Sequence, residues 1–427
     1  MTTTALFGAL LVLMALGVPI AFSMGLAAMA AVAVKGLPLV GVMQKMFGGI
    51  DSFPLMAVPF FILAAELMSG GALTEVLLRF AAQFVGHRRG GLGHTNILTL
   101  TFFSGISGSA LADAAGPGSM LIKMMRESGY HAPYAAALTA SIAIVGPIIP
   151  PSILMIIYAL EDPAVSVIGL YWAGLIPGIM IAAGLAVANH VISIRRNYRS
   201  EMQAPGLREM LLNTWKALPA LALPAIILGG IQSGAFTPTE ASVVAVFYAL
   251  IAGRWIYGTL TWGKLPGMLL RSAMLTASVL LIVAVSNAFA WVLTIAQVPQ
   301  SVAAWVASLH LSPLAFLFAV NVLLLLFGIF IEPLPGVMIL VPILAPISAA
   351  LGIDPLHFGI VVIVNLTLGM ITPPVGGLLF VVAIVSRTPL AAIVRELWPL
   401  MWTEIGILAM LTVFPACSTW LPHLMGR

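Results

Sequence analysis

Long segments without any charged side chain constrain this chain more than any other feature. No Lys, Arg, Asp or Glu occurs from Met1 to Val34, from Ser272 to Ile331, or from Pro355 to Ser386. A helix that crosses a bilayer needs about 20 predominantly apolar residues. Charged residues make up only 7% of the chain, against about a quarter of a soluble domain. The chain is therefore predicted to be an all-α polytopic membrane protein.

The composition and the absence of certain motifs exclude several other classes of protein. With 61% hydrophobic residues and a mean hydropathy of +1.12, the chain could not form the wet surface of a cytosolic enzyme. Its net charge of +4 does not predict nucleic-acid binding. The single Cys417 rules out an intrachain disulfide. The ATP-binding loop, metalloprotease and serine-hydrolase motifs do not occur, so we expect neither an enzyme nor an organic cofactor.

The apolar segments predict about ten transmembrane helices and two re-entrant helical hairpins. The hairpins are expected at residues 93–125 and 312–350, because each segment is apolar, is interrupted in the middle, and is too short for two comfortable spans. The ten crossings are expected at Ala5–Val34, Phe53–Met68, Leu73–Val85, Pro133–Leu160, Ser166–Ile194, Trp215–Ile231, Pro238–Gly253, Leu265–Ile295, His357–Val385 and Glu396–Pro415.

The basic residues predict the orientation in the membrane. If the N-terminus lies outside, sixteen of the 18 Lys and Arg residues fall on the inner side, and only Arg79 and Arg427 do not. Inner loops carry an excess of such residues. Glu66 is then expected near the outer end of the second crossing. The inner set is Lys35, Lys45, Arg88, Arg89, Lys123, Arg126, Arg195, Arg196, Arg199, Arg208, Lys216, Arg254, Lys264, Arg271, Arg387 and Arg395.

A polar connector predicts two halves of opposite orientation. Residues 195–215 would form a cytoplasmic connector between a first repeat (1–194) and a second repeat (216–427). Each half then holds one hairpin and five crossings, and an odd number of crossings inverts the second half. The expected broken helices, 133–160 and 357–385, both contain a Gly-x-x-x-Pro-Pro sequence. Matched interruptions in inverted halves indicate the binding site of a transporter.

The interrupted segments also predict ligands. The run from Ser104 to Ser119 is rich in Gly and Ser, whose unwound carbonyls and hydroxyls suit an alkali cation, although small residues also serve helix packing. Asp113 lies within that run and favours the ligand site. At the Pro-Pro breaks, exposed N–H groups suit a carboxylate, whereas the alternative is a simple kink.

Three other acids lie in apolar surroundings. Glu332, at the tip of the second hairpin, could bind a cation or accept hydrogen bonds from the tip with equal plausibility. Glu66 and Glu404 also fall within predicted crossings, but their neighbours indicate no role. Polar residues in the eighth crossing and near the second hairpin could line a cavity, although interhelical hydrogen bonds are the more common use of such residues. They are Ser286, Asn287, Asn321 and Asn365.

Three segments resemble the large membrane subunit of TRAP (tripartite ATP-independent periplasmic) transporters: Gly105–Ser119, Ile144–Ser152 and Gly369–Gly377. The resemblance covers nearly the whole chain. It implies an elevator-type, sodium-driven importer of organic acids, such as C4-dicarboxylates or sialic acids, in the bacterial inner membrane. It also implies a small four-helix membrane subunit and a periplasmic substrate-binding protein as partners, besides membrane lipid. A self-sufficient sodium-coupled anion symporter with two hairpins is the alternative, and an ion channel is less favoured.

The resemblance places the ligands at the hairpin tips and the helix breaks. The only metal expected is sodium, and the two hairpins with the fourth and ninth crossings would move as one body. The residues expected to bind sodium are Ser104, Gly105, Ser107, Gly108, Gly146, Pro147, Gly336, Gly369 and Thr372. The residues expected to bind substrate are Ser109, Asp113, Pro150, Ser152, Glu332, Pro373 and Gly376.

Overall fold

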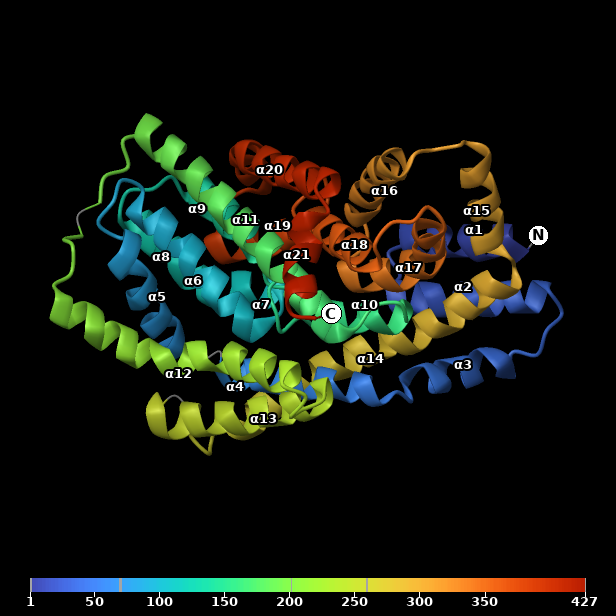
Figure 1. Ribbon diagram of the computed structural model, residues 1–427, viewed down its shortest axis with the longest axis horizontal. Coiled ribbons are helices and arrows are strands. Elements are labelled where there is room, and N and C mark those ends of the chain that lie inside the picture. Colours follow the sequence, from blue (N-terminus) through green and yellow to red (C-terminus); the bar gives the residue numbers. More distant parts are fainter. Residues whose placement is uncertain (1, 69–70, 201, 259, 427) are drawn as a thin grey trace.

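The computed structural model describes residues 2–68, 71–200, 202–258 and 260–426, which form helices joined by loops (Figure 1). Within this part of the chain, six helices are long and apolar enough to cross a membrane, or seven if one bent pair counts as a span. Several of the ten predicted crossings are therefore shorter helices. The six are α11 (Val167–Arg195), α12 (Leu207–Gln232), α13 with its π-helical end (Pro238–Ile256), α14 (Leu265–Ile295), α17 (Pro333–Ala350) and α20 (Leu390–Val413).

Local sequence signals explain where these helices begin. Thr237 and Glu240 form a capping box at the start of α13, and Pro238 occupies the first turn, where its missing N–H is not needed. The Ser166 hydroxyl accepts a hydrogen bond from Gly169 N at the start of α11. Each cap satisfies an N–H group that has no partner inside its helix.

The N-terminal apolar run forms two helices instead of one crossing. Helices α1 (Thr2–Ala15) and α2 (Ile20–Val34) pack against each other, and a short turn that includes Pro19 separates them (Figure 1). The Lys35 Nζ donates to the carbonyl of Ile295 at 2.6 Å, so Lys35 lies at the C-terminal end of α14. The prediction of a single crossing at Ala5–Val34 was wrong, because hydropathy does not distinguish a long helix from a hairpin of two short ones.

Helices α3 (Val40–Ile50) and α4 (Ala57–Met68) run along α14 in the opposite direction. They meet at a 64° bend, where a 3₁₀ turn covers Phe53–Met56. A Cβ on Gly41 would lie 3.0 Å from the Trp291 ring, and Arg271 Nε donates to Glu66 Oε1 at 2.6 Å. Glu66 therefore lies beside the N-terminal part of α14, and α5 (Gly71–Val85) continues from there to the first hairpin.

These contacts correct the expected inner set of basic residues. Helix α14 has 31 residues, so it is about 46 Å long, which exceeds the roughly 30 Å apolar core of a bilayer. If α14 crosses the membrane, Lys35 at one end and Arg271 near the other lie at opposite membrane faces. If Arg271 is inner, Lys35 is outer and Glu66 is not at an outer end. The N-terminus can still lie outside, because α1 and α2 return the chain to the side on which it began.

Two interrupted hairpins lie within the apolar core. The first contains α6 (Gly91–Ser107), α7 (Ala110–Ala115) and α8 (Pro117–Glu127), and the second contains α16 (Pro313–Gly328) followed by α17. Helix α8 packs on α6, and α17 packs on α16. The two hairpins enter from opposite sides of the molecule in Figure 1 and bring their interrupted tips toward its centre.

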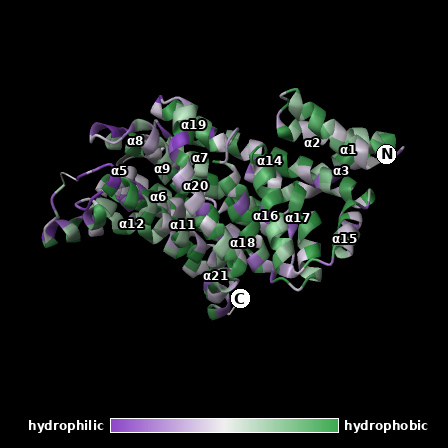
Figure 2. Cartoon of the chain, turned by 90° about the horizontal axis from the view of Figure 1, so that it is seen from above, coloured by the Kyte–Doolittle hydropathy of each residue, from purple (hydrophilic) through white to green (hydrophobic). Residues whose placement is uncertain are grey.

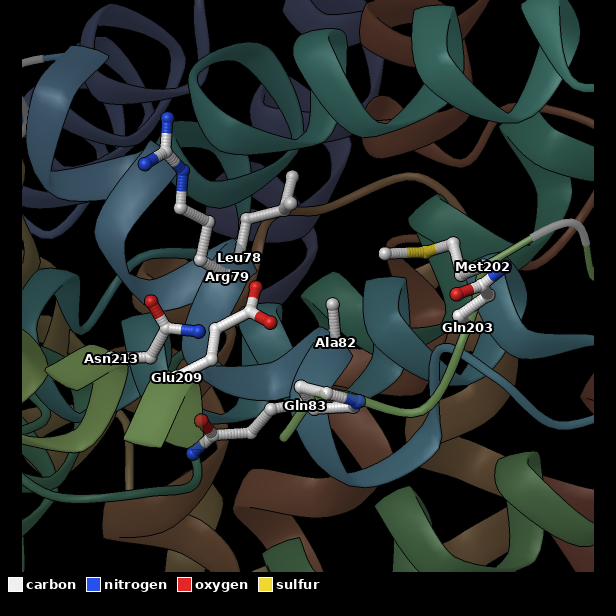
Figure 3. Close-up of a pocket in the computed structure, with 9 residues that line it drawn as sticks. Leu78, Arg79, Ala82, Gln83, Met202, Gln203, Glu209 and Asn213 are labelled. Carbon is white, nitrogen blue, oxygen red and sulfur yellow. The ribbon is translucent and has the colours of Figure 1, made fainter. Parts of the chain in front are cut away.

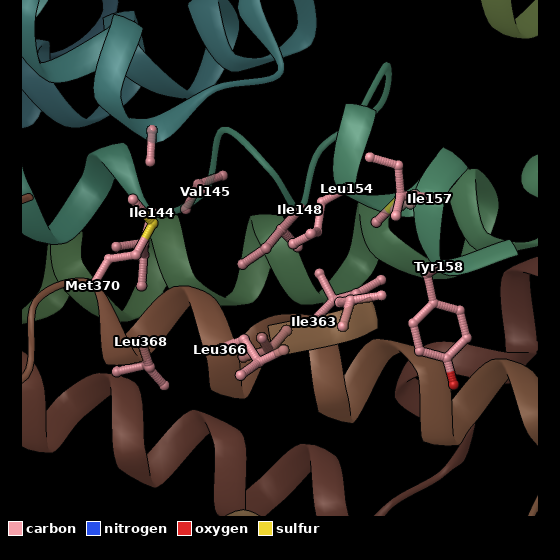
Figure 4. Packing of buried hydrophobic residues seen from close by; sticks show 14 of the residues in the cluster. Ile144, Val145, Ile148, Leu154, Ile157, Tyr158, Ile363, Leu366, Leu368 and Met370 are labelled. Atoms are coloured by element: carbon pink, nitrogen blue, oxygen red, sulfur yellow. The ribbon is translucent and has the colours of Figure 1, made fainter. Parts of the chain in front are cut away.

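The segments with Pro-Pro sequences form two pairs of half-helices. The first pair is α9 (Ala132–Ala143) and α10 (Ile153–Glu161), and the second is α18 (Pro355–Gly369) and α19 (Gly377–Ser386). Figure 4 shows side chains of the first segment, such as Ile148 and Ile157, packed against Ile363 and Leu366 of α18. Helices α11 and α20 pack on both broken segments. The best-buried core therefore lies between the two unwound regions.

Apolar side chains also cover much of the outside, as Figure 2 shows by the green colour on outward-facing helices. Trp215 is 75% exposed and Ile384 is 78% exposed, as expected for side chains that meet lipid. Two short helices complete the fold: α15 (Val298–Ser308) leads into the second hairpin, and α21 (Ala416–Leu424) packs on α11.

The position of Lys35 generates a labelling prediction. In a Cys417→Ser background, Lys35→Cys should react with a membrane-impermeant thiol reagent added to intact cells, whereas Arg89→Cys and Arg199→Cys should react only after the membrane is opened. The physical reason is the length of α14, which separates Lys35 from the inner basic residues. Labelling is read by a mass shift on gels. Protection of Lys35→Cys together with reaction of Arg89→Cys would reverse the orientation.

Candidate functional site

The tip of the first hairpin is organised around a buried carboxyl group. Asp113 is fully buried, and it accepts hydrogen bonds from the hydroxyls of Ser104, at 3.2 Å, and of Ser107. Gly108 ends α6 with a φ of +61°, which L side chains rarely adopt, and the Ser109 hydroxyl caps α7. Asp113 therefore holds the two arms of the tip together from within the hairpin.

The first helix break fits directly against this tip. A Cβ on Gly146 would lie 2.8 Å from Asp113 Oδ2 and 3.0 Å from Ala110 N, so only glycine allows this approach. The Ser152 hydroxyl donates to the carbonyl of Pro147 at 2.6 Å and accepts from Met155 N, which closes the break and caps α10. The Pro150–Pro151 peptide bond is cis.

The second half contains a comparable contact. Gly328 at the end of α16 touches Gly369 at the end of α18, backbone against backbone, and a Cβ on Gly336 would lie 2.9 Å from the Leu366 side chain. The Thr372 hydroxyl donates to the carbonyl of Leu368 at 2.9 Å. The Pro373–Pro374 bond is cis, and Gly376, with a φ of +43°, leads into α19.

Two asparagines connect the second hairpin to neighbouring helices. Asn365 Nδ2 donates to Asn321 Oδ1 at 2.6 Å, and Asn321 Nδ2 donates to the Thr412 hydroxyl at 2.8 Å. These are interhelical hydrogen bonds between α18, α16 and α20, and none of the three residues lines a described cavity beside the hairpin tips. Among the residues described, the buried Asn365 Oδ1 has no hydrogen-bond partner.

A cavity of about 260 Å³ lies where the two tips meet. The predicted residues that line it come from both hairpins and the first break. On the opposite wall, α14 contributes one face of its helix. Met370 of the second break also belongs to the wall. The lining includes Gly108, Ser109, Pro147, Glu332, Pro333 and Met370, with Leu275, Ser278, Val279 and Ile282 from α14.

The remaining predicted residues do not line this cavity. They include the buried members of the tip-to-break contacts and the two Pro-Pro sequences, and one of them, Ser107, lines the second cavity described below. Sequence reasoning missed the α14 face, because an apolar stripe with a single serine looks like ordinary helix packing. The predicted residues outside the cavity wall are Ser104, Gly105, Ser107, Asp113, Gly146, Pro150, Ser152, Gly336, Gly369, Thr372, Pro373 and Gly376.

The electrostatics of the cavity come from helix ends. Among the described residues that line it there is no Lys or Arg, and Glu332 is the acid. Ile153 at the start of α10 and Pro333 at the start of α17 both lie in its wall, so two helix N-termini face it. Unpaired N–H groups and the helix dipole make such ends favourable for an anion.

A second cavity of about 310 Å³ adjoins the first. Ser109, Ile153, Leu275 and Val279 line both cavities. The second one extends from the first hairpin toward α4, where Glu66 forms part of its wall. The two cavities thus form a continuous recess between the hairpins on one side and α4 and α14 on the other.

A separate polar recess lies far from the tips, between α5 and the start of α12 (Figure 3). Arg79 and Gln83 of α5 face Glu209 and Asn213 there, and Gln83 Nε2 donates to the Thr214 hydroxyl at 3.1 Å. No predicted ligand belongs to it. Arg79 also pairs with Glu75 at 2.5 Å, which explains its tolerance within an otherwise apolar segment.

Comparison with known proteins is consistent with this architecture. The chain is 41% identical to the sialic acid TRAP transporter large permease protein SiaM of Vibrio cholerae over 98% of both chains. It is also 41% identical to the C4-dicarboxylate TRAP transporter large permease protein DctM of Pseudomonas aeruginosa over 90% of this chain and 89% of that one. The fold resembles the YdaH transporter of Alcanivorax borkumensis, with a TM-score of 0.63, 18% identity and 88% of each chain covered.

A family model for the DctM component of tripartite ATP-independent periplasmic transporters matches residues 7–417. This match covers the hairpins, both broken helices and α14. Together with the full-length similarity to two large permease proteins, it decides the family that the sequence motifs indicated. The chain belongs to the DctM component of the tripartite ATP-independent periplasmic transporters.

Proposed function

We propose that this chain is the large transmembrane subunit of a sodium-driven secondary importer of organic acids in a bacterial inner membrane. The observation that carries the proposal is the cavity at which two hairpin tips, a helix break and two helix N-termini meet. A periplasmic binding protein would deliver the substrate, and a small membrane subunit would complete the complex. Full-length similarity to large permease proteins does not favour a self-sufficient symporter.

The chemistry of the cavity supports a carboxylate substrate. A carboxylate can accept hydrogen bonds from the N-terminus of α10 without a basic residue in the wall. At the start of α17, Pro333 and Pro335 have no N–H to donate, so that end contributes mainly through its helix dipole. The relatives are named for sialic acid and for C4-dicarboxylates, and both share 41% identity with this chain. Identity therefore does not choose between these substrates, but both names specify organic acids.

We propose that sodium binds behind the cavity, at the two tip-to-break contacts. In the first, the Ser107 hydroxyl donates to Asp113 and accepts from Ser109 N, and the Ser104 hydroxyl lies within donating distance of both the Leu100 carbonyl and Asp113. A hydroxyl oxygen has two lone pairs, so each oxygen keeps acceptor capacity for a cation. In the second, Thr372 donates to Leu368 and likewise keeps acceptor capacity. Carbonyls of the unwound segments would complete each shell. A sodium ion would then stabilise each contact and shape the adjoining substrate cavity.

We propose an elevator movement in which the two hairpins and both broken helices form the moving body. Packing adds α11 and α20, because both contact α9 and α18. Helices α2, α3, α4 and α13 pack with α14 or with α4, and they would form the scaffold. The comparable glycine contacts in the two halves support an inverted repeat, which allows two mirror-related states.

Sodium removal tests the coupling ion. In proteoliposomes that contain both membrane subunits and the cognate binding protein, an inward sodium gradient should drive accumulation of the organic acid. A proton gradient in sodium-free buffer should not, because the proposed ligands are hydroxyls and carbonyls that do not titrate. Radiolabelled uptake measures both conditions. Equal accumulation under the proton gradient would contradict sodium coupling.

A glycine substitution tests the contact between the first tip and its break. Gly146→Ala should raise the sodium concentration for half-maximal uptake about tenfold or more, because the added Cβ would lie 2.8 Å from Asp113 Oδ2. Gly406→Ala in α20 is the matched control, since its Cβ would meet nothing within 4 Å. Uptake is measured over a sodium titration at matched expression. An unchanged titration for Gly146→Ala would remove this contact from the sodium site.

Crosslinking tests the elevator movement. Leu334 of α17 and Ile282 of α14 line the same cavity from the moving body and the scaffold. In a Cys417→Ser background, a short bifunctional thiol reagent that joins Leu334→Cys to Ile282→Cys should abolish uptake, while sodium binding persists.

Two controls accompany this experiment. Each single-cysteine variant treated with the same reagent shows whether the adduct alone blocks the cavity. A crosslink between Gly25→Cys and Val285→Cys joins two scaffold helices, since a Cβ on Gly25 would lie 3.2 Å from Val285 Cγ1, and it should leave uptake intact. Full uptake by verifiably crosslinked Leu334→Cys/Ile282→Cys protein would contradict the elevator movement.

A further inference from the structure

An ion pair between two scaffold helices lies at the end of the recess described above. Arg271 Nε of α14 donates to Glu66 Oε1 of α4 at 2.6 Å. The Arg271 side chain is 55% exposed and the Glu66 side chain is 19% exposed. Glu66 is also part of the cavity wall that faces the first hairpin tip. The pair is therefore positioned at the cavity and is not enclosed between the two helices.

Arg271 continues the face of α14 that lines both cavities. Leu275, Ser278, Val279 and Ile282 follow Arg271 by four, seven, eight and eleven positions, respectively. This spacing places all of them on one side of the helix. Leu275 and Val279 line both cavities, and Ser278 and Ile282 line the central one. Arg271 therefore lies on the same face of α14 as the cavity-lining residues, closer to the start of the helix. This face forms a path from the hairpin tips, past both cavities, to Arg271.

The direction of this path follows from the ends of α14. Its C-terminal end lies beside Lys35, and Arg271 lies near the opposite end, after Lys264. In the proposed orientation, the path therefore leads from the central cavity toward the inner face of the membrane. A substrate that leaves the hairpin tips on this side would meet Arg271.

The chemistry of Arg271 suits that position. A guanidinium group has five N–H donors, and the bond to Glu66 uses the one on Nε. The two Nη groups can bind a carboxylate in a bidentate manner, and such pairs are stronger than neutral hydrogen bonds. Among the described residues that line the central cavity there is no basic side chain, so Arg271 would be the first cation that an outgoing carboxylate encounters.

We infer that Arg271 binds the carboxylate of the substrate on its inner release path, and that Glu66 competes for the same guanidinium group. Glu66 holds Arg271 in place when the path is empty, and its negative charge limits how long the substrate stays. The inference rests on the proposed function, because it takes the transported molecule to be an organic acid. Arg271 is a binding residue of the release path and not a ligand of the central cavity.

The competition predicts opposite effects for the two partners. Loss of the guanidinium in Arg271→Gln should raise the KM for internal substrate about tenfold or more, since charge-assisted hydrogen bonds to a carboxylate are lost. Loss of the competing carboxylate in Glu66→Gln should lower the internal KM and slow release. A purely structural ion pair would instead give both variants the same effect, because either one breaks it.

The measurement uses the complete transporter in proteoliposomes loaded with radiolabelled organic acid. Sodium-dependent efflux to substrate-free binding protein gives the internal KM, and uptake gives the external KM, which Arg271→Gln should leave unchanged. Arg271→Lys keeps the charge but loses the bidentate geometry, so its internal KM should be intermediate. Arg79→Gln is the matched control, because Arg79 pairs with Glu75 at 2.5 Å, is similarly exposed at 58%, and lies in the remote recess of Figure 3.

The outcomes separate this inference from the proposed function. Suppose that the wild-type complex transports organic acids. An unchanged internal KM in Arg271→Gln, or shifts of the same sign in Arg271→Gln and Glu66→Gln, would then overturn the role of Arg271 and leave the proposed function intact. A wild-type complex that transports no organic acid would overturn the proposed function and this inference with it. Opposite shifts of the internal KM, with Arg79→Gln unchanged, would support the competition.

Discussion

The rest of the structure depends on how each hairpin tip satisfies its unwound backbone within an apolar core. Free N–H and carbonyl groups are tolerated at this depth only where protein or a cavity meets them. The first tip and break approach so closely that a Cβ on Gly146 would lie 2.8 Å from Asp113 Oδ2, and Gly328 meets Gly369 in the second half. The close approach requires residues without side chains. The glycines are therefore part of the site even though most of them do not line its cavity.

Asp113 illustrates how a buried carboxyl group can shape the tip without lining the central cavity. Its carboxyl accepts hydrogen bonds from Ser104 and Ser107 of the same hairpin and lies behind Gly146. A carboxyl group in this position gives the tip a fixed shape and lies next to oxygen atoms that suit a cation. Glu332 is the acidic residue in the wall of the central cavity, and the N-termini of α10 and α17 also lie in this wall. In the proposed function, the backbone of the first tip and break therefore separates the sodium site from the substrate cavity.

The chain has few charged residues, and two of its ion pairs differ in how they are formed. Arg79 and Glu75 lie one helical turn apart in α5, whereas Arg271 and Glu66 join α14 to α4 beside the recess. A pair within one helix follows from its sequence spacing. A pair between two residues that lie 205 positions apart in the sequence depends on how the scaffold folds back on itself. This difference explains why Glu66 carried no recognisable role in the sequence.

The amino-acid sequence by itself determined the membrane class, the family, the interrupted segments and the residues at the tips and breaks. These properties follow from composition and from Gly, Pro and Ser, which act on their own stretch of backbone. Only the tertiary structure decided that the N-terminal run folds into α1 and α2, that Lys35 and Arg271 lie at opposite ends of α14, and that α14 forms a wall of the cavity. The physical reason is that a bilayer stabilises an apolar segment wherever it lies along the chain. Hydropathy therefore reports burial in lipid or protein, but it contains no information about which helices pack side by side.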